Sequence, residues 1–341
     1  MARRTKDNVW DKFSRIGVIL VLLYVMFIIL GFAVRLLFFS DERGTSIIPE
    51  GNGVVASAEG TSAQSTAASE TATTNENILD LSVDKTYLAV LEGGTAGIAV
   101  NMSTTGAASA GDLLWSSSDE TVATVDNAGT VTGVKAGKCD ITVSVKGNDV
   151  IAQTVPVTVR HLEQKDGCTY VDGILIVNKS YGLPDSYDPG LDSTTKAAFE
   201  QMKADAAKED LNLYIGSDFR DYAYQVKIYN NYNDLYGWEM ADTFSARPGY
   251  SEHQTGLTID CNTIDDAFGE TAEATWLAEH CADYGFIIRF PDGKENITGY
   301  QYEPWHIRYV GVDTAKEIMS QGLTLEEYLG VQSEYAGPWE G

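Results

Sequence analysis

Two short segments of the chain combine histidines with carboxylates at spacings suited to a catalytic metal ion. Asp260 follows His253 by seven residues, and Glu303 precedes His306 by three. A catalytic zinc ion is held by three protein ligands, with a fourth position open for water. A carboxylate that does not bind the metal can take the proton of that water. Two histidines and an aspartate supply the ligands and Glu303 supplies the base, so these residues predict a zinc hydrolase site.

Gly256 is the residue that allows His253 and Asp260 to reach the same point. An odd separation would place the two side chains on opposite faces of one straight strand. A glycine between them permits the backbone bend that removes this difficulty. Beyond the bend, Leu257 and Ile259 face the core and Asp260 faces a cleft. We therefore expect His253 on a turn and Asp260 on a strand to converge on one metal ion.

The segment around His306 is expected to be a strand. Pro304 disfavours helical geometry for Glu303, and alternation then places His306 on the face opposite Trp305. Glu303 is expected to reach the attacking water. The helical H-E-x-x-H motif of thermolysin-like enzymes does not occur in the chain.

The remaining histidines and the cysteines give no comparable pattern. His161 and His280 have no companion motif, and we assign both a structural role. Four cysteines are too few for a disulfide scaffold on this length, and no pair has the C-x-x-C spacing. We expect buried free thiols or one incidental disulfide, and we expect Cys261 to point away from the metal. The cysteines are Cys139, Cys168, Cys261 and Cys281.

The N-terminal part of the 341-residue chain predicts a membrane anchor. Residues 16–34 contain no charged side chain, and after Arg35 apolar residues continue to position 39, which suffices for a helix across a bilayer. Basic residues precede this run, so we expect a cytoplasmic tail at 1–15, a transmembrane helix at 16–39 and the remainder outside the cytoplasm. A cleaved signal peptide is the alternative, because Gly31-Phe32-Ala33 offers a small-x-small site.

The net charge of the chain restricts its partners, and the composition of the next segment indicates whether that segment is ordered. The formal net charge is -25 at pH 7. Nucleic acids and anionic lipids favour Lys and Arg, so neither is expected as the main partner. Residues 40–77 are rich in Ser, Thr, Ala, Gly and Glu. Such a segment cannot bury enough apolar surface to order itself, and it predicts a flexible linker.

Residues 78–160 predict an antiparallel β-sandwich. Short alternating runs are separated by Gly and Asn/Asp turn signals. The stretch from Trp115-Ser116-Ser117-Ser118-Asp119 to Ala136-Gly137 resembles the bacterial Ig-like group 2 domain. The resemblance implies a surface spacer or adhesion module, without indicating its ligand. Trp115 is expected in the core of the sandwich.

Residues 161–341 predict an α+β domain with a central antiparallel sheet. Helices are expected at 193–211, at 222–240 and at 273–284, with Gly285 as the C-cap of the last. Strands are expected at 213–217, 257–260, 286–290 and 305–310. Helices and strands mix without βαβ regularity.

This domain resembles, from about 165 to 330, the VanY-like D-alanyl-D-alanine carboxypeptidases, zinc peptidases of the superfamily that includes lysostaphin-type peptidases and hedgehog. The matching stretches include Ser217-Asp218-Phe219-Arg220 with Gln225, residues 246–253, residues 256–260 and residues 299–311. The resemblance implies a zinc site and a peptide site. Its members are the ligands His253, Asp260 and His306, the base and later acid Glu303, the carboxylate- or oxyanion-binding Arg220, and Ser251 and Gln225 along the peptide.

The residues around Arg220 depart from the family pattern. A planar guanidinium suits a C-terminal carboxylate, although a surface salt bridge with Asp218 or Asp221 is the alternative. The family's usual Ser-Gly-aromatic-Arg-Ser is here Ser217-Asp218-Phe219-Arg220-Asp221, and Thr258 stands where Ala is common. Because of these two acids, the sequence does not determine which C-terminal group the substrate carries. Their effect on the hydrolysis itself is expected to be smaller.

The sequence thus predicts a membrane-tethered zinc carboxypeptidase acting on peptidoglycan stem peptides that end in D-Ala-D-Ala. One alternative is an L,D-carboxypeptidase that trims the tetrapeptide, since such relatives share all the metal residues. A second is a non-catalytic protein that binds the cell wall or mediates adhesion. The intact Glu303 argues against the second alternative, because a binding protein does not need the base.

Overall fold

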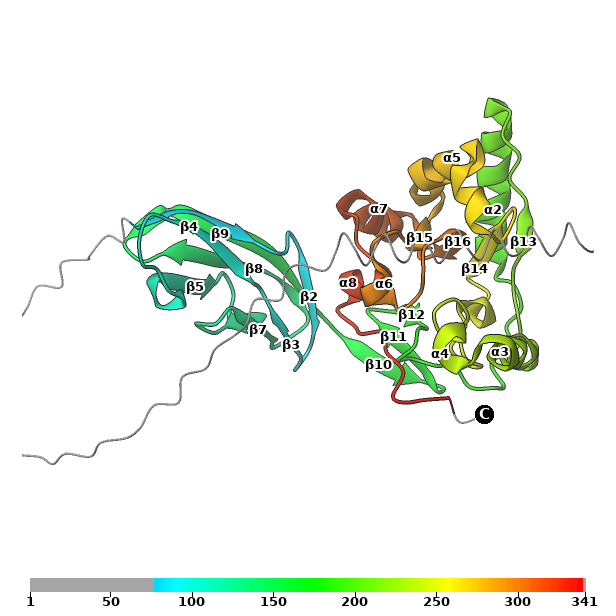
Figure 1. Cartoon of the computed structure of the whole chain (residues 1–341), viewed down its shortest axis with the longest axis horizontal. Coiled ribbons are helices and arrows are strands. Elements are labelled where there is room, and N and C mark those ends of the chain that lie inside the picture. Colours follow the sequence, from blue (N-terminus) through cyan, green and yellow to red (C-terminus); the bar gives the residue numbers. More distant parts are fainter. Residues whose placement is uncertain (1–76, 340–341) are drawn as a thin grey trace, which may run out of the picture. The chain divides into compact units, whose positions relative to one another are not determined.

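The computed structural model describes residues 77–339, which form a β-rich region followed by an α+β region (Figure 1). The predicted cytoplasmic tail, the transmembrane helix and nearly all of the predicted linker lie outside the described residues. Within 77–339, no helix combines the length and the apolar character that crossing a membrane requires.

The β-rich region contains strands β1 to β9, arranged in one pair and two larger sheets. β1 pairs with β4, β3-β7-β6 form one sheet, and β2-β9-β8-β5 form another. The prediction of purely antiparallel pairing is wrong at one place, because β2 and β9 run parallel. The strands between them in sequence supply the long crossover that a parallel pair needs. The bounds are Ile78–Val83, Leu88–Leu91, Thr95–Gly97, Val100–Thr104, Leu113–Ser117, Ala123–Val125, Thr130–Gly133, Gly137–Val145 and Asn148–Arg160.

The interior of this region is apolar. Two clusters of buried Val, Ile and Leu side chains fill it, and the partly buried Trp115 packs against both. Gly129, at a φ of +81°, lies against this indole, and a Cβ at that position would come within 2.7 Å of the Trp115 ring. The expectation that Trp115 belongs to the core is therefore confirmed.

The α+β region contains the predicted central antiparallel sheet. Its strand order is β13-β14-β16-β15, and every neighbouring pair is antiparallel. A smaller antiparallel sheet, β10-β11-β12, precedes it in the chain. The bounds of β10 to β16 in chain order are Leu162–Lys165, Cys168–Val171, Ile174–Ile176, Ile215–Ser217, Thr258–Cys261, Phe286–Phe290 and Glu303–Tyr309.

The helices differ in detail from the predicted ones. The expected continuous helix at 222–240 is wrong, because Gly237 adopts a φ of +79° and separates α3 from α4. The helices expected at 193–211 and 273–284 end in 3-10 turns after Ala206 and His280. The sequence did not predict α6, α7 or α8. The bounds of α2 to α8 are Ser193–Ala206, Tyr222–Tyr236, Trp238–Ala241, Ala272–His280, Glu295–Thr298, Val312–Gln321 and Leu325–Leu329.

The two faces of the central sheet are covered by different helices. On one face, Ile259 and Ile307 pack with Phe199 of α2 and Leu277 of α5. On the other face, Ile287 packs with apolar side chains of α7 and α8. Strand alternation then directs the residues next to Ile259 and Ile307 away from the first core. This second face carries the polar side chains of the site.

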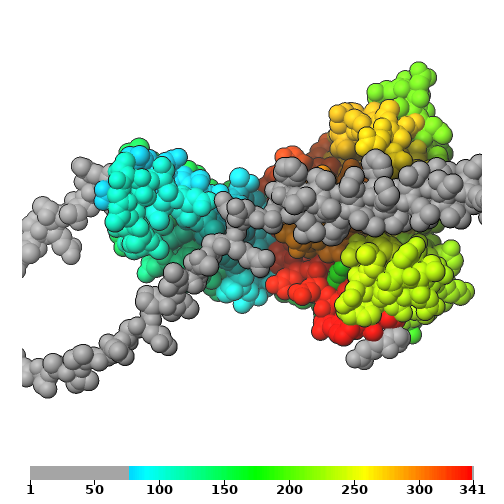
Figure 2. All heavy atoms as spheres, viewed as in Figure 1, coloured from blue at the N-terminus to red at the C-terminus, as the bar shows by residue number. Residues whose placement is uncertain are grey.

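The C-terminal segment packs beside α3 and α4. Figures 1 and 2 show this segment, in red, against residues coloured yellow-green. The Arg247 guanidinium lies 4.0 Å from the centroid of the Tyr335 ring and donates to the Gly337 carbonyl oxygen at 2.8 Å. Tyr229 of α3 meets Trp339 edge to face, with centroids 5.1 Å apart. The end of the chain thus stabilises one flank of the peptidase region.

Candidate metal centre

His253 lies in a 3-10 turn, Glu252–Thr255, that ends at Gly256. Gly256 has a φ of +72°, and a Cβ there would collide with the carbonyl oxygen of Gly190, so the predicted bend requires glycine on both counts. The turn directs His253 toward β14. Its Nδ1 lies 2.6 Å from the carbonyl oxygen of Asp218, and its Nε2 lies 3.2 Å from Asp260 Oδ2.

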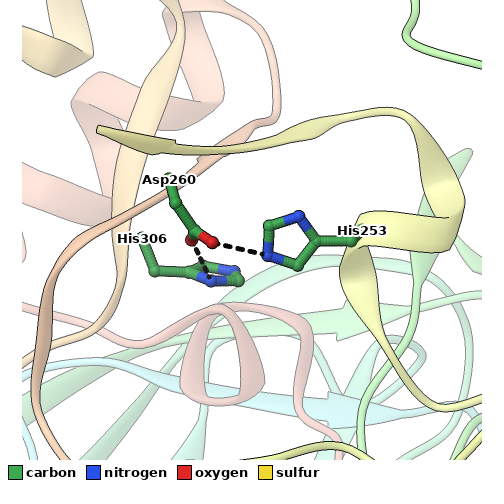
Figure 3. Close-up of side chains that lie close together, drawn as sticks. All are labelled: His253, Asp260 and His306. Carbon is green, nitrogen blue, oxygen red and sulfur yellow. Dashed lines mark ion pairs between the residues drawn. The ribbon is translucent and has the colours of Figure 1, made fainter. Parts of the chain in front are cut away.

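Asp260 and His306 are direct neighbours across two paired strands. Asp260 on β14 stands opposite His306 on β16, and Asp260 Oδ1 lies 3.1 Å from His306 Nδ1. The candidate ligand atoms of His253, Asp260 and His306 all lie within 4.8 Å of one another. Figure 3 shows the carboxylate turned toward both rings. The structure thus brings the three predicted ligands together, and all three are buried.

The donor set fits a catalytic zinc ion. Two imidazole nitrogens and a carboxylate oxygen are ligands that zinc prefers, and three protein ligands leave a position for water. Asp260 Oδ1 is buried yet has no hydrogen-bond partner within 77–339. Buried polar atoms in native proteins are nearly always satisfied. An unsatisfied carboxylate oxygen facing two histidines is therefore consistent with a cation at this point.

Glu303 reaches the same point through a break in strand alternation. Three residues separate it from His306, which in a regular strand would place the two side chains on opposite faces. The register of β16 against β15 shifts beyond the Ile288–Ile307 pair, in the part of β16 that contains Pro304. In this irregular part of the strand, Glu303 Oε2 lies 3.5 Å from His306 Nδ1. Glu303 is therefore located where the sequence placed it, although alternation alone would not have put it there.

The buried setting shifts the proton affinity of these groups in different directions. Burial raises the pKa of the Glu303 carboxyl to about 7, with His306 opposing the shift and Asp260 adding to it. Burial disfavours the imidazolium of His306, but Asp260 and Glu252 outweigh it and raise the pKa to about 9. His253 and His306 together overcome burial and hold the pKa of Asp260 well below its usual range. A carboxyl that titrates near neutrality suits a group that first accepts and later returns a proton.

Arg220 lines the same cleft without an ion-pair partner among the described residues. Its Nε is buried and unsatisfied, and its backbone N–H donates to the His253 carbonyl oxygen at 3.2 Å. Asp221 accepts from the Tyr224 backbone N–H at 2.6 Å as the N-cap of α3. The alternative of a surface salt bridge with Asp218 or Asp221 is therefore wrong, because Asp221 caps a helix and neither acid lies within ion-pair distance.

Gln225 and Ser251 also line the cleft, as the resemblance implied. Both are almost completely buried. Gln225 Nε2 donates to the Ala246 carbonyl oxygen at 2.7 Å, whereas Gln225 Oε1 has no partner within the described part of the chain. The free amide oxygen is an acceptor available to a peptide N–H.

The cleft has a volume of ≈ 560 Å³, within the range of about 300–1,000 Å³ typical of ligand pockets. Tyr224, Ile228 and Tyr232 of α3 line it at helical spacing, and Asp265 and Asp266 contribute acidic groups. This mixture of apolar and acidic lining suits a peptide that carries both apolar and cationic groups.

The sequence reasoning missed four buried charged side chains next to the site: Glu252, Arg289, Arg308 and Glu326. A signal for them was present. Arg289 interrupts the apolar strand Phe286–Phe290, and Arg308 shares a strand face with His306. Arginine at an interior position of a buried strand is rare unless it is paired, so both positions indicated buried partners.

The other histidines and the cysteines lie outside the metal group. His161 Nδ1 lies 2.6 Å from Glu92 Oε2, and the His280 ring packs 4.6 Å from the Trp276 ring. Neither belongs to the cluster of ligand atoms found within 77–339. All four cysteines are free and buried, which confirms the expectation of buried thiols.

Comparison with known proteins identifies the family. The model of the D-alanyl-D-alanine carboxypeptidase (VanY) family matches residues 188–312, and that of the bacterial Ig-like domain (group 2) matches residues 80–155. The solved L,D-carboxypeptidase DacB from Streptococcus pneumoniae is 40% identical, with 52% of this chain and 100% of that chain covered and a TM-score of 0.48. The bifunctional D-Ala-D-Ala dipeptidase and D-Ala-D-Ala carboxypeptidase VanXYC of Enterococcus gallinarum is 36% identical over 135 residues, covering 37% of this chain and 70% of VanXYC. The chain therefore belongs to the VanY family of carboxypeptidases, and an Ig-like domain precedes its peptidase domain.

Two further relatives extend the comparison. YodJ of Bacillus subtilis, which is named as a carboxypeptidase, is 39% identical over 180 residues, covering 46% of this chain and 66% of YodJ. The chain therefore spans just under two thirds of the length of that curated relative. A variant of the D,D-pentapeptidase VanY from a VanB-type resistance cassette was solved with Zn(II). It is 33% identical, with 45% of this chain and 97% of that chain covered and a TM-score of 0.41.

Proposed function

We propose that the protein is a zinc-dependent carboxypeptidase that releases the C-terminal D-alanine of peptidoglycan stem peptides. The observation that carries the proposal is the convergence of His253, Asp260 and His306 with the buried carboxyl of Glu303 in one cleft. Membership of the VanY family and the names of its relatives support the substrate class.

The chain's own residues have distinct roles in the proposed mechanism. His253, Asp260 and His306 would hold the zinc ion, which supplies a Lewis acid and lowers the pKa of a bound water when present. Glu303 takes a proton from the attacking water and returns it to the nitrogen of the departing D-alanine. Burial keeps the pKa of Glu303 near 7, so both transfers are accessible at neutral pH.

Arg220 is proposed to bind negative charge on the peptide. Its guanidinium faces the cleft and lacks an ion-pair partner within 77–339. A planar guanidinium can pair with the terminal carboxylate of the substrate or with the oxyanion that develops on the scissile carbonyl. Either contact would orient the last peptide bond next to Glu303.

The preferred substrate has two candidates. The first is a D,D-carboxypeptidase acting on pentapeptides that end in D-Ala-D-Ala, which is supported by the match to the D-alanyl-D-alanine carboxypeptidase family model. The second candidate is an L,D-carboxypeptidase acting on tetrapeptides, which is favoured by the 40% identity with DacB over its whole solved chain. Digestion of purified pentapeptide and tetrapeptide muropeptides separates them. Release of D-alanine from tetrapeptides with pentapeptides left intact would exclude the first candidate.

Two single substitutions distinguish a catalytic protein from one that only binds the cell wall. Glu303→Ala should retain about one zinc per chain and lose hydrolysis, because the base is removed and the ligands remain. Glu279→Ala, an exposed carboxylate on α5, is the matched control and should keep both properties. Equal hydrolysis by Glu303→Ala and the unaltered protein would refute the catalytic assignment and favour the non-catalytic alternative.

We also propose that the N-terminal segment tethers the protein to the membrane, with the peptidase domain outside the cytoplasm and the Ig-like domain as a spacer. The uncharged run at 16–34 and the basic residues before it motivate this location. Membrane fractionation of the full chain and of a chain lacking residues 1–39 tests it. Recovery of the full chain in the soluble fraction would contradict the tether.

A further inference from the structure

His306 presents its two ring nitrogens to different surroundings. On the side of the metal group, Nδ1 lies 3.1 Å from Asp260 Oδ1 (Figure 3). On the other side, Nε2 lies 3.5 Å from Oε2 of Glu252. Both Nε2 of His306 and Oε2 of Glu252 are buried and have no hydrogen-bond partner in the described part of the chain. An atom able to donate and an atom able to accept therefore face each other, each otherwise unsatisfied.

The two carboxylate oxygens of Glu252 differ in their hydrogen bonding. Oε1 accepts from Arg289 Nε at 2.8 Å and from Arg308 Nη1 at 2.8 Å. Rotation of the carboxylate away from this position would break two charge-assisted hydrogen bonds. Oε2 makes no such bond, and it is the oxygen directed at His306.

The carboxylate is fixed from further away in the fold. Arg289 donates from Nη1 and Nη2 to the two oxygens of Glu326 on α8, at 2.8 Å and 2.6 Å. Arg308 Nη2 donates to the Leu175 carbonyl oxygen at 2.6 Å. Glu252, Arg289, Arg308 and Glu326 are all buried, and their formal charges balance. Such a cluster forms a rigid support whose unused acceptor faces a candidate metal ligand.

We propose that Glu252 is a positioning residue that accepts the Nε2–H of His306 and thereby fixes the tautomer in which Nδ1 binds the metal. A ligating histidine normally donates its other ring N–H to a carboxylate, a carbonyl or water, and this partner sets both the tautomer and the ring orientation. Glu252 supplies that partner here. The proposal rests on the zinc assignment of the proposed function.

The two histidine ligands are held in opposite ways. His253 Nδ1 faces the neutral carbonyl oxygen of Asp218 at 2.6 Å, which leaves Nε2 for the metal. His306 has the reverse arrangement, and its outer partner is a carboxylate rather than a carbonyl. A carboxylate partner makes the imidazole a stronger ligand than a neutral partner does. Loss of the Glu252 charge should consequently weaken metal binding.

Zinc affinity of matched variants is the first test. In Glu252→Gln, the remaining oxygen is retained by the two arginines, so the amide nitrogen meets the Nε2–H of His306 and repels it. Zinc affinity, measured by competition with a chromophoric chelator, should fall about 10- to 100-fold. Glu317→Gln on α7 is the matched control, since it removes one carboxylate charge outside this cluster, where Glu317 accepts from the Tyr328 hydroxyl at 2.7 Å. Its affinity should stay within about threefold, and equal losses in the two variants would overturn the proposal.

Nitrogen NMR of the unaltered protein is a second test that needs no variant. With ¹⁵N-labelled histidine and zinc bound, the His306 signals should show a protonated Nε2 and a metal-bound Nδ1, and the His253 signals should show the reverse. A protonated Nδ1 at His306 would overturn the proposal even if Glu252→Gln failed to fold. A protein that takes up no zinc would refute the proposed function itself, whereas zinc bound through His306 Nε2 would refute only the role of Glu252.

Discussion

The two folded regions fill their interiors in different ways. Among the described residues of 78–160, the only buried charged side chain is Arg160, at the end of β9. The core there consists of side chains such as Ile141 and Val157, both 1% exposed or less. In the peptidase region, Arg289 and Arg308 are fully buried together with carboxylates. One interior is almost purely apolar and the other contains a network of charges.

This difference shows what a reactive site requires of the fold around it. Removing a charge from water costs several kcal/mol, and a buried ion pair often stabilises a protein no better than apolar residues of similar size. The Ig-like region buries almost no charge and therefore largely avoids this desolvation cost. In the peptidase region the buried charges surround the candidate metal ligands, where a fixed carboxylate can orient a histidine. The network is therefore better explained by positioning than by stability.

Removal of the metal should give the largest contrast between the regions. Chelation should lower hydrolysis at least about a hundredfold, because a metal contributes several kcal/mol to the barrier reduction. It should also lower the unfolding temperature of the peptidase region, because zinc binds only the folded site. Calorimetry with and without chelator measures the shift. An equal shift in the unfolding of the Ig-like region would show that metal binding stabilises both regions and would contradict the expected contrast.

Glu326→Ala should destabilise the peptidase region by about 3–5 kcal/mol, because it leaves the buried Arg289 without its bidentate partner. Denaturant unfolding measures the effect. Glu334→Ala, an exposed carboxylate near the C-terminus, is the control and should change stability by less than about 0.5 kcal/mol. A loss below about 1 kcal/mol for Glu326→Ala would show that Arg289 is not left as an uncompensated buried charge when Glu326 is removed.

Ile141→Val should destabilise the Ig-like region by about 0.5–1.5 kcal/mol, since it removes one methylene from a fully buried side chain. The site would be unaffected, so kcat/KM should stay within about twofold. The same variant identifies which calorimetric transition belongs to the Ig-like region. A marked loss of hydrolysis in Ile141→Val would show that the two regions are coupled.

Lys85→Ala should have the smallest effect. The Lys85–Asp84 pair, at 2.5 Å, is slightly shorter than the Arg289–Glu326 pair at 2.6 Å, but its side chains are 38% and 36% exposed. Exposed pairs of this kind contribute about 0–1 kcal/mol. Denaturant unfolding should therefore show a change below about 1 kcal/mol. A larger loss of stability would mean that burial does not account for the different contributions of the Lys85–Asp84 and Arg289–Glu326 pairs.

Local sequence rules predicted the ligand-bearing elements well. Gly256 indicated the bend after His253, and alternation put Asp260 on the cleft side of its strand. The same rules failed where several elements meet. Gly237 was read as part of a helix, although its φ of +79° divides α3 from α4. The parallel pairing of β2 with β9 was also missed, because strand pairing depends on contacts far apart in the chain.

The candidate site also contains features that local sequence rules do not predict. Alternation cannot explain how Glu303 reaches the side of His306, because their separation is odd. The structure nevertheless places Glu303 Oε2 3.5 Å from His306 Nδ1, in the part of β16 where its register against β15 shifts. Arg220 was predicted with a competing surface salt bridge, which the structure replaces with a helix cap by Asp221.

The sequence by itself determined which residues make up the site and the family to which they belong. Histidines are few, and metal ligation restricts both residue type and spacing, so His253, Asp260 and His306 could be found without a fold. Only the tertiary structure decided how these residues are held. Glu252 meets Arg289 and Arg308 across 37 and 56 residues of chain. Contacts at such separations follow from strand register and packing, which no local pattern encodes.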